Sequence, residues 1–433
     1  MAASDRFDVV VVGGGPAGLS CARETAAAGL STALFERGEE CGAKNVSGGR
    51  LYLGPLADLP AGFWKDVPLE RRVVRETLTL VSGAATASID LRSPRLGEAP
   101  VESHTVLRAR FDRWLAERTA EAGAMVVPGA RVDGVLLRDG RAIGVRLGAD
   151  EIEAGVVVAA DGALSRIALA AGIGGPPRPD RLAIGVKEIV ALDPGRIEDR
   201  FGLEPGEGAA RLVIGDPTRG IPGGGFLYTN RDSISVGVVA KLDALGAAGP
   251  GGPETHALIE ALRAVPEVAR LLAGGETAEY SAHLVPELSV DDAPRRSMPG
   301  LIVVGDAAGL VVNHGFTVRG MDLAIASGVI AGRAIAQAAR GGDPATAAPA
   351  LYERGLKESF VMRDMEAARR SIGFLSRDRL YSHYPRAVCA LLEEVFSFGP
   401  GGKGKTGAAL WKSARTGFLN LRGLADLWAM RRI

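Results

Sequence analysis

The sequence predicts an α/β protein in which a parallel sheet is interrupted by antiparallel strands and followed by a helical region. Three observations predict this class. A strand, a glycine-rich turn and a helix open the chain over residues 7–29. Residues 181–240 are then strand-rich, with apolar and polar side chains alternating in RLVIGD at 211–216 and in FLYTNRDSISVGVV at 226–239, which is typical of antiparallel strands. Beyond about residue 345 the pattern is helical and mixed in charge.

The N-terminal segment has the order of a βαβ unit. FDVVVV at 7–12 predicts a buried strand, and LSCARETAAAG at 19–29 predicts a helix that ends at Gly29. LSTALFE at 30–36 predicts a second strand, after which we expect a polar loop at 37–52.

A second α/β segment follows. ETLTLVSGAATASIDLR at 76–92 partly alternates and predicts antiparallel strand. FDRWLAERTAEAG at 111–123 predicts a helix, and the dipeptide Asp139–Gly140 predicts a hairpin turn. The apolar run 301–304 predicts a further strand, and the pattern after residue 320 predicts the helix that follows it, as in the N-terminal α/β part.

A glycine motif joins the first strand to the first helix. Gly13 permits a tight turn, Gly15 lets the backbone approach a pyrophosphate, and Gly18 lets the helix and strand pack closely. The free N–H groups at the start of the helix favour an anion. Glu36 ends the second strand, where a carboxylate can accept hydrogen bonds from the ribose hydroxyls of an adenosine. This context favours a dinucleotide site over a glycine turn without a ligand.

Two further strand ends carry an aspartate. Asp161 follows VVVAA and precedes Gly162, whereas Asp306 follows LIVV and Gly305. A strand-end aspartate can simply cap a helix, and this alternative stays open for each residue alone. Three such elements in one order favour a long ligand across several strand ends. FAD is favoured over NAD because antiparallel strands follow in place of a continued parallel sheet, and because these two aspartates mark further strand ends across which a long ligand could lie.

Composition excludes several classes of function. Lys plus Arg and Asp plus Glu both number 51, so the net charge gives no support for nucleic-acid binding. Cys21, Cys41 and Cys389 have no zinc or iron–sulfur spacing, so we predict no metal site. These cysteines favour a reducing compartment, and no apolar run reaches about 18 residues. We expect a cytoplasmic protein, with peripheral contact at the inner membrane face left open.

The order of these motifs resembles the glutathione-reductase-type flavoproteins. GGGPAG, Glu36, Arg108 before FDRWL, DGALSR and GDAAG match that pattern, and the resemblance covers 5–340. More narrowly, the chain resembles the branch of para-hydroxybenzoate hydroxylase, geranylgeranyl reductases and electron-transfer-flavoprotein:quinone oxidoreductases. The resemblance implies an α/β (α+β) fold with an FAD-binding Rossmann-like domain, an inserted antiparallel β-sheet substrate domain and a helical C-terminal region.

The same resemblance implies domain bounds and cofactor contacts. The FAD-binding domain would comprise 1–75, 101–180 and 290–345, the substrate or quinone domain 76–100 and 181–289, and the helical region 346–433. The implied cofactor-binding residues are Gly13, Gly15, Pro16, Ala17, Gly18, Glu36, Arg37, Arg108, Asp161, Gly162, Gly305, Asp306, Gly315 and Gly320. Among them, Arg108 would contact the phosphate region and Asp306 the ribityl chain. Backbone amides of 315–320 would face the N1–O2 edge of the flavin.

Four stretches outside the FAD motifs resemble FixC, the quinone-oxidoreductase subunit of bifurcating FixABCX systems. They are AKNVSGGRLY at 43–52, GGGFLYTNRDSISVGVV at 223–239, YSAHLVPE at 280–287 and NHGFTVRGMDLAIASG at 313–328. This resemblance implies electron-transfer-flavoprotein subunits as donors and a quinone or other apolar small molecule as acceptor. Single-chain relatives bind a [4Fe–4S] cluster through C-terminal cysteines, but here only Cys389 lies in that region. A small ferredoxin-like protein is therefore a further expected partner.

No catalytic acid, base or nucleophile is assigned, because the flavin carries the chemistry. Lys44, Asn45 and His314 are the candidates for pocket contacts or proton transfer, and Phe226 and Tyr228 are expected to line a core or pocket. Two other functions stay open. One is a flavin-dependent double-bond reductase or dehydrogenase acting on an isoprenoid or specialised metabolite, and the other is a non-catalytic electron-relay or docking subunit. The basic, tryptophan-bearing tail from residue 403 is either an amphipathic terminal helix or a docking segment for a partner or membrane.

Overall fold

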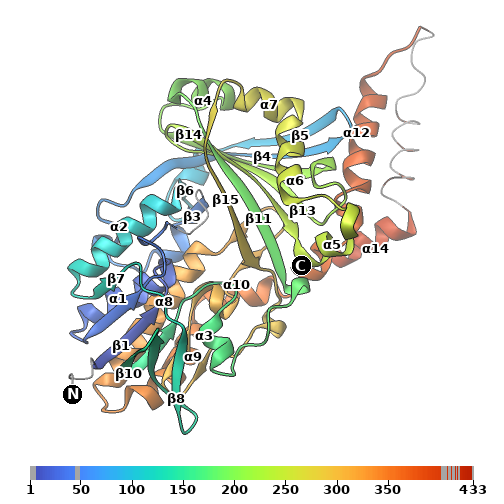
Figure 1. The fold of residues 1–433 in the computed structure, drawn as a ribbon. Coiled ribbons are helices and arrows are strands. Elements are labelled where there is room, and N and C mark those ends of the chain that lie inside the picture. The colour runs from blue at the N-terminus through green and yellow to red at the C-terminus, as the bar shows by residue number, and fades with distance from the viewer. Residues whose placement is uncertain are drawn as a thin grey trace.

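Two large sheets organise the protein, and they meet along the edge where the parallel strands end (Figure 1). The computed structural model describes residues 6–43, 49–400, 407, 411, 415, 417 and 420–431. The first sheet has the order β16-β17-β10-β1-β2-β7, with β9 paired to β10 and β8 to β9. Its strands are β1 (Arg6–Val12), β2 (Thr32–Phe35), β7 (Met125–Val127), β8 (Gly134–Arg138), β9 (Arg141–Leu147), β10 (Asp150–Ala159), β16 (Ser297–Met298) and β17 (Leu301–Val303).

The predicted βαβ unit is confirmed. The valines of β1 are almost fully buried, as expected for a central parallel strand covered on both faces. Helix α1 (Pro16–Ala27) starts with a proline in its first turn and is followed by Gly29, whose φ of 83° closes the helix. The expected helix is α2 (Arg108–Glu121), and the hairpin at Asp139–Gly140 joins β8 to β9.

The register of the parallel strands determines where a ligand can bind. Val12 pairs with Phe35 on one side and with Ala159 on the other, and Ala159 pairs with Val303. The strands β1, β2, β10 and β17 therefore end in one row. The residues that follow this row project from the same edge of the sheet.

The second sheet is antiparallel except for one pair, β12 with β4. Its order is β15-β11-β14-β13-β12-β4-β6-β3, with β5 paired to β4. Its strands are β3 (Gly49–Tyr52), β4 (Leu69–Ser82), β5 (Ala85–Arg92), β6 (Ser103–Val106), β11 (Leu182–Ala191), β12 (Glu207–Gly215), β13 (Gly223–Thr229), β14 (Ser233–Lys241) and β15 (Glu276–Pro286). Helices α4 (Pro194–Phe201), α6 (Thr255–Ala264) and α7 (Pro266–Leu272) cover its outer face and form a second hydrophobic core there.

The prediction of a polar loop over 37–52 is wrong for its last four residues. Residues 49–52 form β3, which pairs with β6 and extends the second sheet. The short strand at 49–52 carries only two apolar side chains, too few for alternation to be recognised.

The proposed domain boundary at residue 75 falls inside β4, because this strand runs from residue 69 to residue 82.

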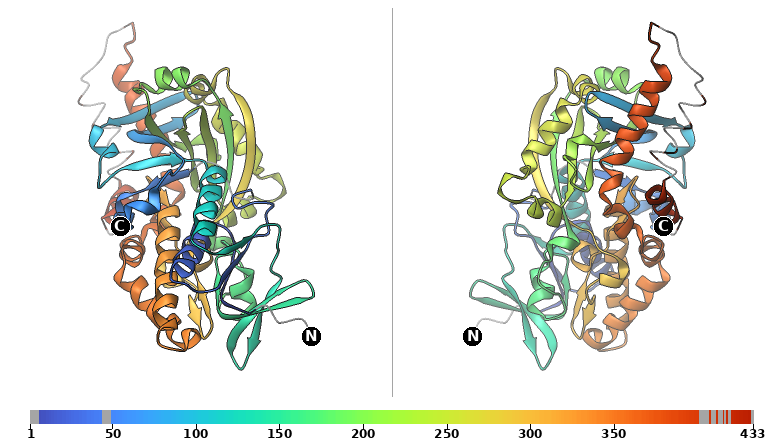
Figure 2. Two further views of the ribbon diagram at one scale, coloured as in Figure 1. Left: turned by 90° about the vertical axis from the view of Figure 1, so that its left-hand side faces the viewer. Right: turned by 90° about the vertical axis from the view of Figure 1, so that its right-hand side faces the viewer.

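Helices from the C-terminal half pack against both sheets. Helix α8 (Met321–Ala339) lies against α1, where a Cβ on Gly328 would overlap the carbonyl oxygen of Ala17. The remaining helices are α3 (Arg166–Ala170), α5 (Leu242–Ala247), α9 (Pro344–Glu358), α10 (Phe360–Ala367), α11 (Ser371–Leu375), α12 (His383–Phe396) and α14 (Leu421–Met430). Helix α12 runs along the second sheet, as two views turned by 90° show (Figure 2). Within the described ranges, no helix is long and apolar enough to cross a membrane.

Candidate functional site

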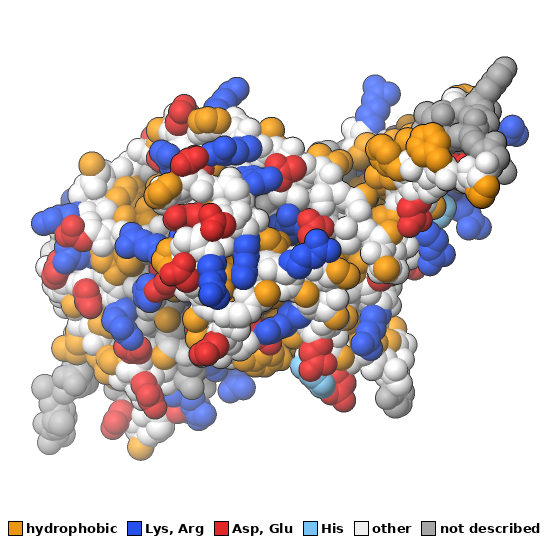
Figure 3. Space-filling view, turned by 90° about the horizontal axis from the view of Figure 1, so that it is seen from above, with side chains coloured by type: hydrophobic (Ala, Val, Ile, Leu, Met, Phe, Trp, Pro, Cys, Tyr) orange, Lys and Arg blue, Asp and Glu red, His pale blue; other side chains and the backbone are white. Residues whose placement is uncertain are grey.

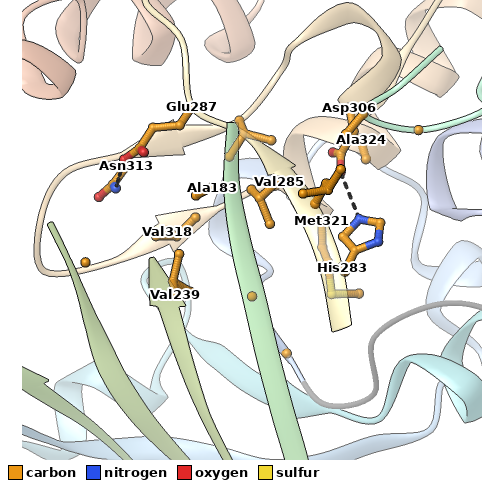
Figure 4. A pocket seen from close by; sticks show the side chains of 18 of the residues that line it. Ala183, Val239, His283, Val285, Glu287, Asp306, Asn313, Val318, Met321 and Ala324 are labelled. Atoms are coloured by element: carbon orange, nitrogen blue, oxygen red, sulfur yellow. Dashed lines mark hydrogen bonds and ion pairs between the residues drawn. The ribbon is translucent and has the colours of Figure 1, made fainter. Parts of the chain in front are cut away.

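A cavity of about 970 Å³ lies between the two sheets. One wall consists of the row of parallel strand ends, and the other is the inner face of β11, β13, β14 and β15. The loop between β17 and α8, together with α14, completes it. Figure 4 shows part of this space, with apolar side chains such as Val239, Val285 and Met321 directed into it. The volume and the mainly apolar lining are those of a site for a large small-molecule ligand.

The glycine turn has the shape needed to approach a phosphate group. Gly13 has a φ of 108°, and a Cβ there would overlap the carbonyl oxygen of Ala160. A Cβ on Gly15 would instead point into open space, where the nearest atom is Nη2 of Arg108 at 3.9 Å. Gly15 is also the N-cap of α1, and because it has no side chain, the first amides of this helix stay accessible.

Gly18 and Gly305 differ from the other predicted residues because they do not line the cavity. A Cβ on Gly18 would overlap the carbonyl oxygen of Gly13, and one on Gly305 would lie 2.8 Å from the Cβ of Ala17. Both glycines therefore permit close packing between α1 and its neighbours rather than a ligand contact.

Glu36 is fixed at the end of β2 by backbone donors. Its carboxylate accepts hydrogen bonds from the N–H of Gly14 at 2.7 Å and the N–H of Gly38 at 2.6 Å. Cys41 packs beneath this turn, and burial, together with the charge of Glu36, raises the pKa of its thiol to about 12. Cys41 is therefore a neutral packing residue at physiological pH, and a reactive thiol is not favoured.

Arg108 enters the cavity from the start of α2. Its Nε and Nη2 donate to the two oxygens of Asp112 at 2.9 and 2.7 Å, across one helical turn. Burial disfavours the charged form, but the carboxylates of Asp112 and Asp306 outweigh it and raise the pKa of Arg108. The cavity wall therefore contains a permanent, oriented guanidinium group.

Asp161 contributes to the cap of α3, whose N-cap residue is Ser165. Its carboxylate accepts from the hydroxyl of Ser165 at 2.7 Å and from the N–H of Ile167 at 3.0 Å, at the start of α3. Burial raises the pKa of Asp161, although these hydrogen bonds favour the charged form. The capping role left open by the sequence is thus present, and the next residue, Gly162, has a φ of 82° and lines the cavity.

Asp306 meets His283 across the junction between the two sheets. Nε2 of His283 lies 3.8 Å from Oδ2 of Asp306, and Figure 4 shows the two side chains facing each other. The preceding residue, Gly305, donates its N–H to Oγ of Ser327 at 3.0 Å, which ties the strand end to α8. Asp306 is thereby positioned in the cavity wall.

The loop at 313–320 borders the cavity beside the N-terminus of α8. Gly315 has a φ of 85° and donates its N–H to Oδ1 of Asn313 at 2.9 Å. Asn313 in turn donates to Oε1 of Glu287 at 3.2 Å, and burial raises the pKa of Glu287. Burial and the charge of Arg319 lower the pKa of His314, so its ring is neutral near pH 7.

Most of the predicted cofactor residues come together in this one cavity. Those lining it are Gly13, Gly15, Pro16, Ala17, Glu36, Arg37, Arg108, Asp161, Gly162, Asp306, Gly315 and Gly320, and His314 also lines it. Lys44 and Asn45 lie outside the described residues. Individual cofactor contacts remain predictions, but glycine turns, a fixed carboxylate and an oriented arginine fit the adenosine and pyrophosphate parts of FAD.

Lys187 and Arg50 are two of the charged residues of the cavity wall that the sequence did not single out; others include Arg131, Lys241 and Glu287. Lys187 projects from β11, and Arg50 projects from β3 and forms an ion pair with Glu76 at 2.5 Å. Phe226 and Tyr228 line the cavity, as expected. Lys187 could have been found from alternation along β11, since residues 183, 185 and 187 share one face. Arg50 lies on a strand too short for such a pattern.

Comparisons with known proteins agree with this site. A family model described as FAD dependent oxidoreductase matches residues 8–173. The probable electron transfer flavoprotein-quinone oxidoreductase YdiS of Escherichia coli K12 is 41% identical over 91% of both chains. The protein FixC of the same strain is 39% identical over 96% of this chain and 97% of its own.

Solved structures show the same fold. A geranylgeranyl bacteriochlorophyll reductase-like protein of Thermoplasma acidophilum has a TM-score of 0.71 at 23% identity and covers 98% of this chain and 99% of its own. The myxobacterial FAD-dependent chondrochloren halogenase CndH has a TM-score of 0.65 at 20% identity and covers 99% and 98%. Given the extent of identity with YdiS and FixC, the chain belongs to the FixC and electron transfer flavoprotein-quinone oxidoreductase family, and it is an FAD-dependent oxidoreductase.

Proposed function

We propose that this protein accepts electrons from an electron transfer flavoprotein and passes them to a quinone, with FAD bound in the cavity between the two sheets. The observation that carries this proposal is the 41% identity with a probable electron transfer flavoprotein-quinone oxidoreductase over 91% of both chains. The four FixC-like stretches lie outside the FAD motifs, so they add information beyond the fold.

The residues of the strand-end row would hold the cofactor. The amides at Gly15 and the start of α1 would bind its pyrophosphate, and Glu36 its adenosine ribose. Arg108 would neutralise phosphate charge, and Asp306 would bind the ribityl chain. FAD, when bound, supplies electron transfer in one- or two-electron steps. The chain itself must position it, exclude water and admit both partners.

The remaining cavity wall suits an apolar acceptor. Ala183, Val239 and Val285 of the second sheet and Val318 of the loop line it, and no serine or cysteine nucleophile is required there. Tyr228 lines the same wall, and burial raises the pKa of its hydroxyl, so that it remains a proton-bearing donor. A ring with two carbonyl oxygens and an apolar tail fits such a lining.

The cavity reaches the surface beside exposed apolar side chains. Phe316 is 67% exposed, and Leu427 and Met430 of α14 are about half exposed while also lining the cavity. Further hydrophobic side chains gather toward the end of α12, where Phe396 is 75% exposed (Figure 3). We propose that this side makes peripheral contact with the membrane, from which an apolar quinone would enter.

A separate ferredoxin-like subunit is part of the proposal. The sequence contains only three cysteines, whereas a [4Fe–4S] cluster usually needs four thiolates. All three are buried: Cys21 in α1, Cys41 shortly after β2 and Cys389 in α12. Any cluster that links this flavoprotein to other redox centres must therefore be supplied by another chain.

The test is an anaerobic half-reaction. The purified flavoprotein is reduced by an electron transfer flavoprotein, and its absorbance is followed after a quinone is added. We expect full reoxidation by the quinone and none by a polyprenyl substrate. A polyprenyl product without quinone turnover would support a double-bond reductase instead, which the likeness to a geranylgeranyl reductase-like fold keeps as the second candidate. Failure of both acceptors would favour a non-catalytic relay subunit.

A further inference from the structure

One row of the cavity wall contains a single long charged side chain. Ala183, Gly185 and Lys187 alternate along β11 and share the face that lines the cavity. In register, Lys187 lies beside Gly237 of β14 and Ser281 of β15. Its immediate neighbours are therefore small, and the lysine side chain has room to extend over the sheet surface.

The amino group of Lys187 lies over an aromatic ring. Phe226 of β13 pairs with Gly237, and a Cβ on Gly237 would lie 2.5 Å from Cζ of Phe226, so the ring covers the glycine. Nζ of Lys187 lies 5.6 Å from the centroid of that ring, a distance at which an ammonium group is attracted to the aromatic face. Lys187 as a whole is only 8% exposed. The amino group is thus placed in the cavity wall and shielded from bulk water.

The electrostatic surroundings include a second cation. The positive charge of Arg108 in α2 lowers the pKa of Lys187, whereas the negative charge of Glu279 in β15 raises it. Of the charged and titratable groups on the neighbouring elements, Arg108 of α2, Tyr228 of β13, Lys241 of β14, His283 of β15 and Asp306 after β17 line the same cavity, whereas Asp112 of α2 and Glu279 of β15 do not. Asp112 already binds Arg108, and Asp306 faces His283. A negative charge placed beside both cations would lower the repulsion between Arg108 and Lys187.

Burial, with Arg108 as a smaller cause, lowers the pKa of Lys187 to about 7. Near neutral pH the side chain is therefore divided between amine and ammonium. A negative charge within a few Å favours the ammonium form, so it would raise this pKa.

We propose that Lys187 is a further cofactor-binding residue: its amine takes a proton from solvent as the anionic part of FAD enters, and the resulting ammonium binds that charge together with Arg108. The step forms one N–H bond, breaks one O–H bond of the hydronium ion or buffer acid that supplies the proton, and transfers no electrons. The negative group is either the pyrophosphate or the reduced ring system. The inference rests on the use of FAD and is independent of the donor and acceptor proposed above.

The expected pH dependence follows from linkage. Below pH 7 the free protein already carries the proton, so the affinity for FAD is constant. Between pH 7 and the higher pKa of the complex, binding takes up one proton, and the dissociation constant rises by up to about tenfold for each pH unit. Above both pKa values, the contribution of Lys187 to binding disappears.

The experiment is calorimetric titration of FAD into protein from which the cofactor has been removed. Titrations at about pH 8 in two buffers of different ionisation enthalpy give the number of protons bound. We expect proton uptake for the native chain and none for Lys187→Met or Lys187→Arg. At about pH 6, Lys187→Met should bind FAD about 10- to 100-fold more weakly, which corresponds to loss of one hydrogen bond between charged groups. Lys187→Arg should keep the affinity and lose its pH dependence, because guanidinium stays protonated.

Matched controls make the outcome decisive. Lys241→Met removes the other lysine of the same wall, which donates to Ser376 at 2.8 Å, and it should leave proton uptake unchanged. Circular dichroism checks that each variant is folded. If the Lys187 variants lose proton uptake on binding oxidised FAD, the pyrophosphate is the negative group that Lys187 binds. If they lose it only on binding dithionite-reduced FAD, the reduced ring is that group. If Lys187→Met and Lys187→Arg both retain native uptake and affinity in both redox states, the proposal is wrong.

Discussion

Arg108 and Asp112 form a two-point ion pair across one turn of α2, in which Asp112 is fully buried and Arg108 faces the cavity. The pair directs a guanidinium group toward the site while its counter-charge stays within the protein. Because both hydrogen bonds come from one edge of the guanidinium, Asp112 does not use the N–H groups of Nη1. Asp112 therefore holds the charge of Arg108 within the fold and also orients its guanidinium group toward the cavity.

Replacing Asp112 by Ala should destabilise the fold and weaken FAD binding together. Removing one partner of a buried pair leaves an uncompensated charge, which costs about 3 kcal/mol of unfolding free energy. Denaturant unfolding of the cofactor-free protein measures this cost. Asp180→Ala is the control, because Asp180 pairs with Arg178 at the surface, and its stability should stay within error of the native chain.

Gly18→Ala should reduce stability and FAD content. The added Cβ would overlap the carbonyl oxygen of Gly13 and lie 3.0 Å from the Cβ of Ala160, so α1 must move away from the strand ends. Such overpacking costs about 1–3 kcal/mol. Thermal unfolding and the flavin absorbance of the purified variant report the two effects. Gly62→Ala meets no atom within 4 Å and should change neither.

Glu36→Gln should lower the affinity for FAD by about 10- to 100-fold, because the hydrogen bonds to a charged carboxylate are replaced by weaker ones. Fluorescence titration measures this directly. Glu39→Gln is the control, since Glu39 is exposed on the same loop. If the two variants bind FAD equally well, Glu36 only holds the N–H groups of Gly14 and Gly38 and does not contact the cofactor.

The sequence predicts the part of the site that belongs to the βαβ unit better than the part that belongs to the second sheet, and the reason lies in how each is built. Gly13 and Glu36 lie in one continuous βαβ unit, where fixed spacing places the motif residues at the strand ends. Lys187, His283 and Arg50 come from strands far apart in sequence. Their proximity depends on long-range strand pairing, which local patterns do not determine. The same cause hides β3, whose partner β6 begins some fifty residues later.

Stability should depend on pH through Glu287. Burial raises the pKa of this carboxyl group, although Lys241 and the amide of Asn313 oppose the shift. The folded state therefore binds the proton more tightly than the unfolded state. This stabilisation is fully present below the unfolded pKa and is lost as the pH rises through the folded one. Glu287→Gln, which stays neutral, should raise the melting temperature at about pH 8 and have little effect near pH 4. Equal shifts at both pH values would contradict this origin.

The three cysteines should be inert in the folded protein. Burial raises the thiol pKa of Cys21 strongly, that of Cys41 to about 12, and that of Cys389 as well. Because the thiolate is the nucleophile, alkylation by iodoacetamide at neutral pH should be slow in the folded state. Mass spectrometry should find unmodified protein under native conditions and three modifications in denaturant, matching the three cysteines of the sequence. Rapid native labelling of Cys41 would instead mean that the turn around Gly14 opens readily, since the Sγ of Cys41 packs beneath it.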